Sequence, residues 1–417
     1  MVDLLFSRRN FLRVGAVLPF LGLDTLNYAA QPTHSDHSVI FVWLGGGASH
    51  IELFNPVPEA PAEYRSIHGA IKTNVSGIEI SGGWKNLANH CDKVTIVRSF
   101  GHSDATHETA THWLLSGHEN TDKSPGTQSK YPSLGAITCS ICGPNNTITG
   151  IPTYVSMSKI DGDGPSWLGG QYGPYLADQR GIANLTPTYP QIRASNRYEL
   201  LKGLDKLDEA IDTRGNMKTF TELRPQSYNL LYGKAREAFD LSKESAQNRE
   251  KYGKNGEQLL MARRLIEAGA KFVSCSFNGW DTHADMDSSL PNLITPLDIA
   301  LSALLEDLPQ NCLLVLTSEF GRTPRLNKGL VGVSDKRGRD HWSNVNSLMF
   351  AGGNFNHGRI IGTTNNKAEE IKDDKCGPID LQKTIADWLE LPHGIQKNDF
   401  SGRPRYLIEG GKNILNG

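Results

Sequence analysis

A series of near-continuous apolar runs, each ended by glycine or polar residues, constrains the fold of this chain most strongly. The first run is Ser38–Leu44, which Gly45-Gly46-Gly47 ends at once. Runs that are apolar at successive positions are typical of strands buried on both faces of a parallel sheet. Later runs of the same character predict further strands at Val94–Ser99, Ile151–Met157, Lys271–Phe277, Cys312–Thr317 and Asn346–Phe350.

Helical patterns lie between these runs. The clearest is a stripe of leucine and isoleucine between Leu293 and Leu308, spaced as on one face of a helix. Other helices are predicted at Thr106–Ser116, Glu257–Ala268 and Ile379–Leu389, with a short one at Trp84–His90. Alternation of strands and helices predicts an α/β fold: a mostly parallel central sheet with helices on both faces.

The chain length suits one large α/β domain with insertions, which we assign to residues 31–417. Two segments interrupt the alternation. Residues around 158–193 are rich in Gly, Pro and Tyr and predict a loop-rich insertion, of the kind that often shapes a functional site. Residues around 195–252 predict a helical insertion, because they are charged and helical in character from Glu222 onward.

Residues 1–30 have the parts of a twin-arginine signal peptide. Arg8 and Arg9 precede Phe11 and Leu12, and a short apolar stretch then runs from Val14 to Leu23. That stretch is too short to span a bilayer, which takes about 20 apolar residues. The alternatives are an amphipathic N-terminal helix and retention as an uncleaved anchor. We expect export by the twin-arginine translocase to a periplasmic or extracellular location.

Charge and cysteine content narrow the range of partners. The formal net charge is -2, and no basic run occurs, so nucleic acid is not an expected partner. No second apolar stretch approaches membrane-spanning length, so no stable transmembrane anchor is expected. Cys139-Ser140-Ile141-Cys142 is a lone C-x-x-C, which predicts a local disulfide or free thiols rather than a structural zinc site.

Imidazole and carboxylate side chains follow several of the predicted strands. Ligands of such sheets bind outside the carboxyl ends of the strands, so these residues are candidates for a common site. Polar residues are common in any loop, but the repeated pairing of His with Asp or Glu favours a metal site. The residues in question are His50 and Glu52, His102, Asp104 and His107, Asp281 and His283, Glu319 and Arg322, and Arg339, Asp340 and His341.

This set of side chains suits zinc, manganese or iron better than calcium. A bound divalent ion would polarise a phosphoryl or sulfuryl oxygen and generate hydroxide near neutral pH. Arg322 and Arg339 could bind a tetrahedral anion through two hydrogen bonds each. The alternative for each arginine is a structural ion pair.

Several common catalytic motifs are excluded. His107 and His112 are five residues apart, whereas a zincin helix needs histidines at i and i+4 on one face. Gly45-Gly46-Gly47 lacks the lysine and the spacing of a phosphate-binding Walker loop, and no G-x-S-x-G elbow marks a serine hydrolase.

A set of motifs in fixed order resembles the alkaline-phosphatase-like superfamily, which includes sulfatases and phosphodiesterases. The chain is most similar to its twin-arginine-exported bacterial branch known as domain of unknown function 1501. The motifs that carry the resemblance are Gly45 through Glu52, Val97-Arg98-Ser99, His107 through Gly117, Trp167-Leu168-Gly169 with Tyr172 and Pro174, Gly279 through His283, Glu319 through Pro324 and Gly338 through Trp342.

The resemblance implies roles for individual residues. The superfamily's nucleophile position falls on His107, where a nucleophile, a metal ligand and an anion contact all remain open; Thr106 and Thr109 are the nearest hydroxyls. The superfamily's metal motifs correspond to Asp281 and His283, to Glu319 in place of an Asp-His pair, and to His341. The aspartate expected after the first strand is absent, and His50 or Glu52 could substitute for it.

Together these features predict an exported metal-dependent hydrolase of phosphate or sulfate esters. Its metal ligands would be Asp281, His283, Glu319, His341 and His50, its catalytic residues His107, Thr109, Arg322 and Arg339, and its substrate a small-molecule or glycan ester. The main alternative is a non-catalytic binding protein for an anionic ligand or glycan on the same scaffold. A metal enzyme with different chemistry is a further alternative.

Overall fold

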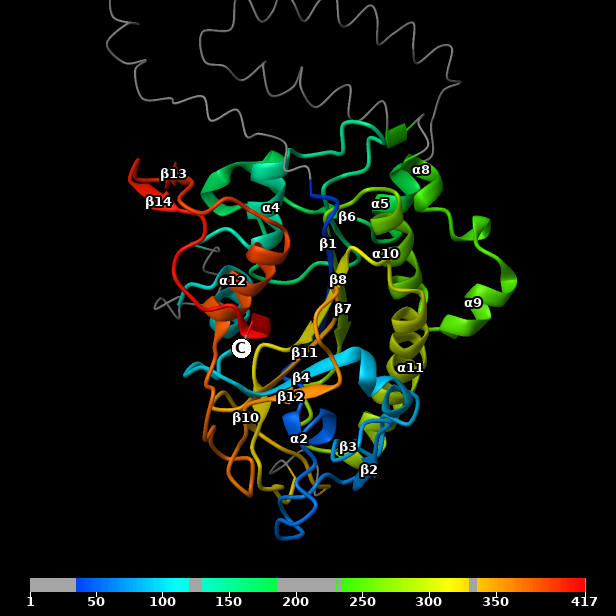
Figure 1. The fold of residues 1–417 in the computed structure, drawn as a ribbon, viewed down its shortest axis with the longest axis vertical. Coiled ribbons are helices and arrows are strands. Elements are labelled where there is room, and N and C mark those ends of the chain that lie inside the picture. The colour runs from blue at the N-terminus through cyan, green and yellow to red at the C-terminus, as the bar shows by residue number, and fades with distance from the viewer. Residues whose placement is uncertain (1–34, 120–129, 186–229, 232–234, 330–335, 417) are drawn as a thin grey trace, which may run out of the picture. The chain divides into compact units, whose positions relative to one another are not determined.

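A computed structural model describes residues 35–119, 130–185, 230–231, 235–329 and 336–416. Within these residues the largest sheet has eight strands, in the order β12-β4-β11-β8-β1-β7-β5-β6 (Figure 1). The strands are β1 (Ser38–Gly45), β4 (Val94–Phe100), β5 (Tyr154–Ser156), β6 (Tyr175–Leu176), β7 (Phe272–Asn278), β8 (Cys312–Thr317), β11 (Asn346–Gly352) and β12 (Arg359–Ile361).

Strand β11 runs against the direction of the other strands. It pairs antiparallel with both β4 and β8, whereas β1 pairs parallel with both β7 and β8. Strands β5, β6 and β12 also pair parallel with their neighbours. The prediction of a mostly parallel sheet is therefore confirmed, and each predicted apolar run forms one of its strands.

The side chains of β1 alternate between two apolar cores, one on each face of the sheet. Ile40, Val42 and Leu44 pack in the core that contains α10 (Glu257–Glu267) and α11 (Met286–Asp307). Phe41 and Trp43 pack on the other face with α3 (His107–Ser116), α4 (Leu134–Cys142) and α12 (Pro378–Trp388). Helices on both faces explain why the strands are apolar at successive positions (Figure 1).

Shorter elements complete the described part of the chain. They comprise the helices α2 (His50–Leu53), α5 (Gln179–Asn184), α8 (Ala235–Ala238) and α9 (Ala246–Tyr252), the 3-10 turns η1 (Leu87–Lys93), η2 (Ser166–Leu168), η3 (Gly170–Tyr172), η4 (Leu241–Lys243) and η5 (Ile414–Asn416), and the two-stranded sheets β2 (Ala70–Lys72) with β3 (Glu79–Ser81), β9 (Gly321–Arg322) with β10 (His341–Trp342), and β13 (Gln396–Asn398) with β14 (Pro404–Tyr406).

Some boundaries differ from those predicted. The short helix expected at Trp84–His90 is the 3-10 turn η1, which begins three residues later. Helix α4 was not predicted, because its small and apolar residues have no clear helical period. It is set by burial against β5 and by the Ser133 side chain, which accepts a hydrogen bond from the Ala136 N–H at its start. The predicted helical insertion around 195–252 is described only in part, because residues 195–229 and 232–234 lie outside the described residues.

Helix α11 begins at Met286, seven residues before the predicted stripe that starts at Leu293. It is therefore longer than the sequence predicted. Within the described residues it alone has the length and composition to cross a membrane. Its apolar stripe is nevertheless buried in the core beneath the sheet, with Leu297, Leu301 and Leu304 at most 2% exposed. This burial accounts for its apolar character.

A fully buried ion pair joins helix α2, which follows β1, to the segment before β10. Arg339 donates from Nη2 to Glu52 Oε1 at 3.1 Å, and both side chains are 0% exposed. The other Glu52 oxygen accepts from the Ser66 hydroxyl at 2.7 Å and from the Ile67 N–H at 3.1 Å. Because every group is satisfied, the pair ties two distant segments together without leaving an uncompensated charge.

We predict that Glu52→Gln lowers the free energy of unfolding by about 3–5 kcal/mol, because it leaves the Arg339 charge buried without a counter-charge. Urea unfolding followed by circular dichroism measures the loss. The matched control is Arg337→Ala, since the Arg337–Asp287 pair has 46% and 54% exposed side chains and should contribute at most about 1 kcal/mol. Equal losses in the two variants would contradict a structural role for the buried pair.

Candidate metal centre

The candidate site lies at the carboxyl edge of the sheet, where several chain segments meet. Asp281 and His283 follow β7, Glu319 and Arg322 follow β8, and His107 begins the helix that follows β4. His341 lies in β10, shortly before β11. Because β11 is antiparallel, its first residues reach the same edge as the last residues of its neighbours, and this brings His341 to the site.

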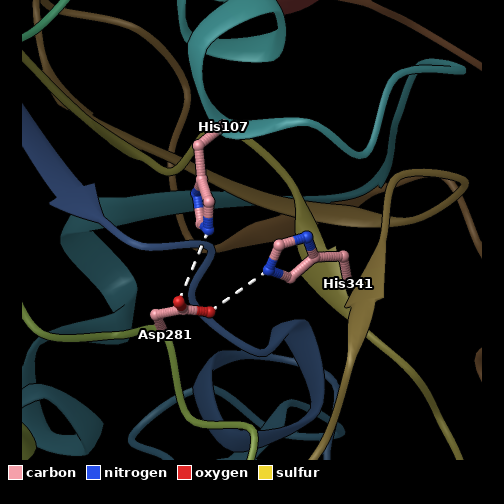
Figure 2. A group of neighbouring side chains, drawn as sticks. All are labelled: His107, Asp281 and His341. Atoms are coloured by element: carbon pink, nitrogen blue, oxygen red, sulfur yellow. Dashed lines mark hydrogen bonds and ion pairs between the residues drawn. The ribbon is translucent and has the colours of Figure 1, made fainter. Parts of the chain in front are cut away.

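Asp281 contacts three imidazoles, and Figure 2 shows two of them, those of His107 and His341. Its Oδ2 is 3.5 Å from His107 Nε2, and its Oδ1 is 3.2 Å from His341 Nε2. One ligand atom from each of these three residues lies within 4.8 Å of the others. His283 joins the group, since its Nε2 is 3.0 Å from Asp281 Oδ1 and 3.0 Å from His341 Nε2. We call these four side chains the metal cluster, because they are candidate ligands of a metal ion.

The Nδ1 atom of each imidazole in the metal cluster is within hydrogen-bond distance of an acceptor on the side away from the cluster. His107 Nδ1 is 2.9 Å from Glu319 Oε1, and His283 Nδ1 is 2.7 Å from Asp340 Oδ1. His341 Nδ1 is 2.8 Å from the carbonyl oxygen of Ala105. All three partners accept hydrogen bonds, so a proton on each Nδ1 would leave the Nε2 lone pair facing the cluster. Metal-binding histidines have this arrangement, in which an outer acceptor fixes the tautomer and the ring orientation.

The donor set fits a transition-metal ion. Two Nε2 atoms, of His283 and His341, face each other at 3.0 Å. Two lone pairs at that separation repel each other unless a proton or a cation lies with them. Three imidazoles and one carboxylate are ligands typical of zinc, manganese and iron, whereas calcium prefers oxygen ligands throughout.

Charge within the metal cluster is unevenly distributed. Burial acts to raise the pKa of Asp281, but the hydrogen bond and charge of Arg322 outweigh it and lower the pKa to about 2. The hydrogen bond with Glu319 raises the pKa of His107. Burial and the nearby Arg322 charge lower the pKa of His341. Asp281 is therefore ionised near neutral pH and available as an anionic ligand.

Glu319 supports His107 rather than facing the cluster directly. Its side chain is 3% exposed, and the oxygen that binds His107 also accepts from the Gly46 N–H at 2.7 Å. Its other oxygen accepts from the Ser318 hydroxyl at 3.0 Å. The sequence assigned Glu319 as a ligand and His107 to the reacting group, whereas these contacts favour His107 as the ligand and Glu319 as the acceptor that orients it.

Arg322 is fully buried and its guanidinium is already occupied. It donates from Nε to Gly47 O at 2.6 Å and from Nη1 to Arg339 O at 3.1 Å. Its Nη2 contacts both Gly46 O and Asp281 Oδ1. These contacts favour a role for Arg322 in positioning Asp281. They do not support direct binding of an anion by Arg322.

Three other predicted site residues lie apart from the metal cluster. Arg339 is paired with Glu52, as described above. His50 is 1% exposed and its Nε2 is 3.0 Å from Ala368 O; burial lowers its pKa to about 3, so it is neutral. The Thr109 hydroxyl is 3.5 Å from Thr106 O within the same helix. None of the three contacts the cluster, so their predicted roles as anion contact, metal ligand and hydroxyl group find no support here.

Glycine after β1 allows the loop to approach the site closely. Gly46 has a φ of 113°, and a Cβ there would lie 2.6 Å from the Asp281 backbone nitrogen. Gly47 has a φ of 77°, and a Cβ there would lie 2.3 Å from the Phe320 ring. Both positions therefore need glycine, and the loop brings the Gly46 N–H to Glu319.

Sequence reasoning missed the role of Asp340. It was noted beside Arg339 and His341, but nothing in the sequence showed that it contacts His283, 57 residues away. The signal that could have found it is its position directly before a predicted ligand, on a segment that reaches the carboxyl edge.

Comparison with solved structures gives only weak likenesses. Ps i-CgsB in complex with k-i-k-neocarrahexaose has a TM-score of 0.42 at 11% identity, covering 91% of this chain and 75% of that chain. The PsFucS1 sulfatase from Pseudoalteromonas sp. has a TM-score of 0.38 at 12% identity, covering 93% and 74%. A variant of TAB5 alkaline phosphatase with Mg bound in its M3 site has a TM-score of 0.36 at 13% identity, covering 85% and 97%.

Sulfatases and alkaline phosphatases are members of the superfamily that the sequence resembles, but likenesses at these TM-scores carry no argument about activity. No curated protein is significantly similar to this chain. The family predicted from the motifs is confirmed by a family model that matches residues 36–416, from the start of the described sheet to the last described turn. The chain therefore belongs to the family described as "Protein of unknown function (DUF1501)".

Proposed function

We propose that this protein is an exported, metal-dependent hydrolase of phosphate or sulfate esters, with a small-molecule or glycan ester as substrate. The observation that carries the proposal is the orientation of His107, His283 and His341. Each has Nδ1 bound to an acceptor and Nε2 directed at the group around Asp281. A structural histidine needs no such orientation, whereas a metal ligand does.

The chain's own residues would bind the metal and would keep one of its ligands, Asp281, negatively charged. His107, His283, His341 and Asp281 would be the direct ligands. Arg322 holds the Asp281 carboxylate in place and keeps it ionised. A divalent ion bound here would supply Lewis-acid polarisation of an ester oxygen and an activated water near neutral pH.

Helix α3 favours an anion at the same place. It begins at His107, so the positive end of its dipole lies beside the metal cluster, and the side chain of the preceding Thr106 does not cap its first turn. Helix N-termini are common binding sites for phosphate and sulfate. This feature supplies the anion contact that the buried Arg322 and Arg339 do not.

The cluster favours water as the attacking group. Both nitrogens of His107 are engaged, Nδ1 by Glu319 and Nε2 near Asp281, which is the arrangement of a ligand rather than of a nucleophile. Among the described residues, no hydroxyl or thiol is hydrogen-bonded to any of the four cluster side chains. Hydrolysis through water needs no protein nucleophile, so this arrangement is compatible with activity.

A non-catalytic binding protein is the second candidate. The observation that favours it is the same lack of a hydrogen-bonded hydroxyl or thiol at the cluster within the described residues. The two candidates differ in turnover: a hydrolase releases phosphate or sulfate only when the metal is present, and a binding protein releases none.

We predict that the purified protein contains roughly one equivalent of zinc, manganese or iron, and that Asp281→Asn with His341→Ala removes it. Ester hydrolysis, measured as release of inorganic phosphate or sulfate from a panel of esters, should fall with the metal. Elemental analysis by mass spectrometry gives the metal content.

The control is His393→Asn, since His393 is 51% exposed and pairs with Asp387, away from the cluster. It should keep full metal content. A folded wild-type protein that holds no transition metal and takes up none on titration would overturn the hydrolase proposal. Metal without turnover on any ester would leave the binding-protein candidate ahead.

We predict that Glu319→Gln weakens metal binding about 10–100-fold at pH 8, because the amide keeps the hydrogen bond to His107 but removes the charge behind it. The variant should also shift the pH dependence of binding. Glu319 raises the pKa of His107, so in the wild type a proton competes with the metal up to a higher pH. Binding is lost as pH falls through that pKa, and the midpoint of the loss should move to lower pH in the variant.

Competition with a chromophoric chelator at a series of pH values measures both effects. A merely structural role for Glu319 would lower thermal stability without moving the pH midpoint. Asp340→Asn is the matched comparison, since it should weaken binding through His283 and leave the His107 midpoint unchanged.

We also propose that the protein is exported by the twin-arginine translocase, on the basis of the sequence of residues 1–30. We predict that Arg8→Lys with Arg9→Lys keeps the positive charge but abolishes export, because the pathway recognises the arginine pair. Cell fractionation followed by immunoblotting measures the distribution. Unchanged export of the double variant would contradict the proposal, and Arg13→Lys serves as the control.

A further inference from the structure

A cavity of about 860 Å³ opens beside the far strands of the sheet, and none of its lining residues belongs to the metal cluster. Its walls come from the segment after α2, the hairpin of β2 and β3, β4, and the loop after β12. The lining includes Asn55, Glu79, Arg98, Thr364, Asn365 and Asp373. Its volume is within the range of ligand-binding pockets in proteins.

Arg98 of β4 carries a positive charge into this cavity. Its Nε donates to Phe54 O at 2.9 Å, and its Nη2 donates to Glu79 O at 2.7 Å. Both partners are backbone carbonyls, and no carboxylate of the described residues lies within ion-pair distance of it. Burial lowers the pKa of Arg98 to about 10, which is still well above neutral pH. The charge is therefore present. The Glu79 carboxylate attracts it from beyond ion-pair distance, so Arg98 has no direct ionic partner among the described residues.

The buried arginines of the described chain differ in this respect from Arg98, which is partly exposed. Arg322 pairs with Asp281, Arg339 pairs with Glu52, and Arg263 pairs with Glu244. The direct partners of the Arg98 guanidinium are two backbone carbonyls, and carbonyl dipoles do not replace an ionic partner. At the wall of an open cavity, a bound anion can take that place.

The rest of the lining restricts what the ligand can be. The lining includes several amides and hydroxyls, among them Asn55 and Thr364, which are hydrogen-bonded to each other at 2.9 Å. Such groups suit the hydroxyls of a sugar. Glu59, Asp373 and Asp374 are exposed residues of the lining, and their negative charge disfavours a ligand with many anionic groups. One anionic group on a polyhydroxylated body meets both requirements.

We propose that this cavity binds an acidic sugar, whose single carboxylate or ester sulfate pairs with Arg98 while its hydroxyls bind the amide and hydroxyl lining. The proposal does not depend on the function proposed for the metal cluster, since the two sites share no residue. It assigns the protein a second contact with a glycan, separate from any reacting ester.

Saturation-transfer NMR on the full protein tests this with three probes: D-glucuronate, D-glucose 6-sulfate and D-glucose. We expect at least one of the two acids to bind about tenfold or more tightly than glucose, and Arg98→Gln to remove that preference. The acid that binds distinguishes a carboxylate from a sulfate ligand. Arg337→Gln, a change at an exposed arginine, should leave binding unchanged.

Two further measurements keep the test decisive. Asp281→Asn should retain binding of the acid, and a loss there would place the probe at the metal cluster and overturn the assignment to the cavity. If Arg98→Gln does not fold, inorganic sulfate should displace the acid from the wild-type protein. Binding of both acids no tighter than glucose, or unchanged binding in folded Arg98→Gln, would overturn the proposal.

Discussion

The buried guanidinium of Arg322 is the interaction on which the site depends. It lies after β8 and bonds to Gly46 and Gly47 after β1, to Asp281 after β7, and to the Arg339 carbonyl before β10. One side chain thus links the loops after three neighbouring strands of the main sheet with the segment before β10. Because the guanidinium donors are directed in one plane, the loops they join are held at fixed positions relative to one another. The positions of Asp281 and of the imidazoles around it depend on that arrangement of the loops.

The sheet determines which loops can meet. Parallel strands end at one edge, so β1, β7 and β8 deliver Gly46, Asp281 and Glu319 to the same place. Strand β11 is antiparallel to its neighbours, so its end lies at the opposite edge of the sheet and its start lies at this one. His341 therefore reaches the metal cluster from the segment before a strand, whereas the other ligands come after one. A fully parallel sheet of the same sequence order could not bring these residues together in this way.

The carboxylates near the site have two kinds of position. One kind faces the metal cluster, the other supports neighbouring protein groups, and the two differ in the partners that balance their charge. Asp281 is half exposed and shares its charge with Arg322, which leaves it available to a cation. Glu319 and Glu52 are buried, with every contact directed at protein donors. A buried carboxylate needs such donors to be stable. A carboxylate whose oxygens all accept hydrogen bonds from protein groups therefore has a supporting role and is not a direct metal ligand. The partly exposed Arg98, which has no carboxylate within ion-pair distance, is by contrast the place where we propose that an anionic ligand binds.

The sequence by itself determined the strands, the layered α/β class, the family, and the edge of the sheet at which Asp281, His283 and His341 meet. Period and burial of apolar residues are local properties, and strand ends in a parallel sheet share an edge by geometry alone. Only the tertiary structure decided that His107 faces the metal cluster, that Glu319 stands behind it, and that Arg339 pairs with Glu52, 287 residues away. The role of a polar side chain depends on which atom meets it within about 3 Å, and residue type and spacing along the chain do not specify contacts between distant loops.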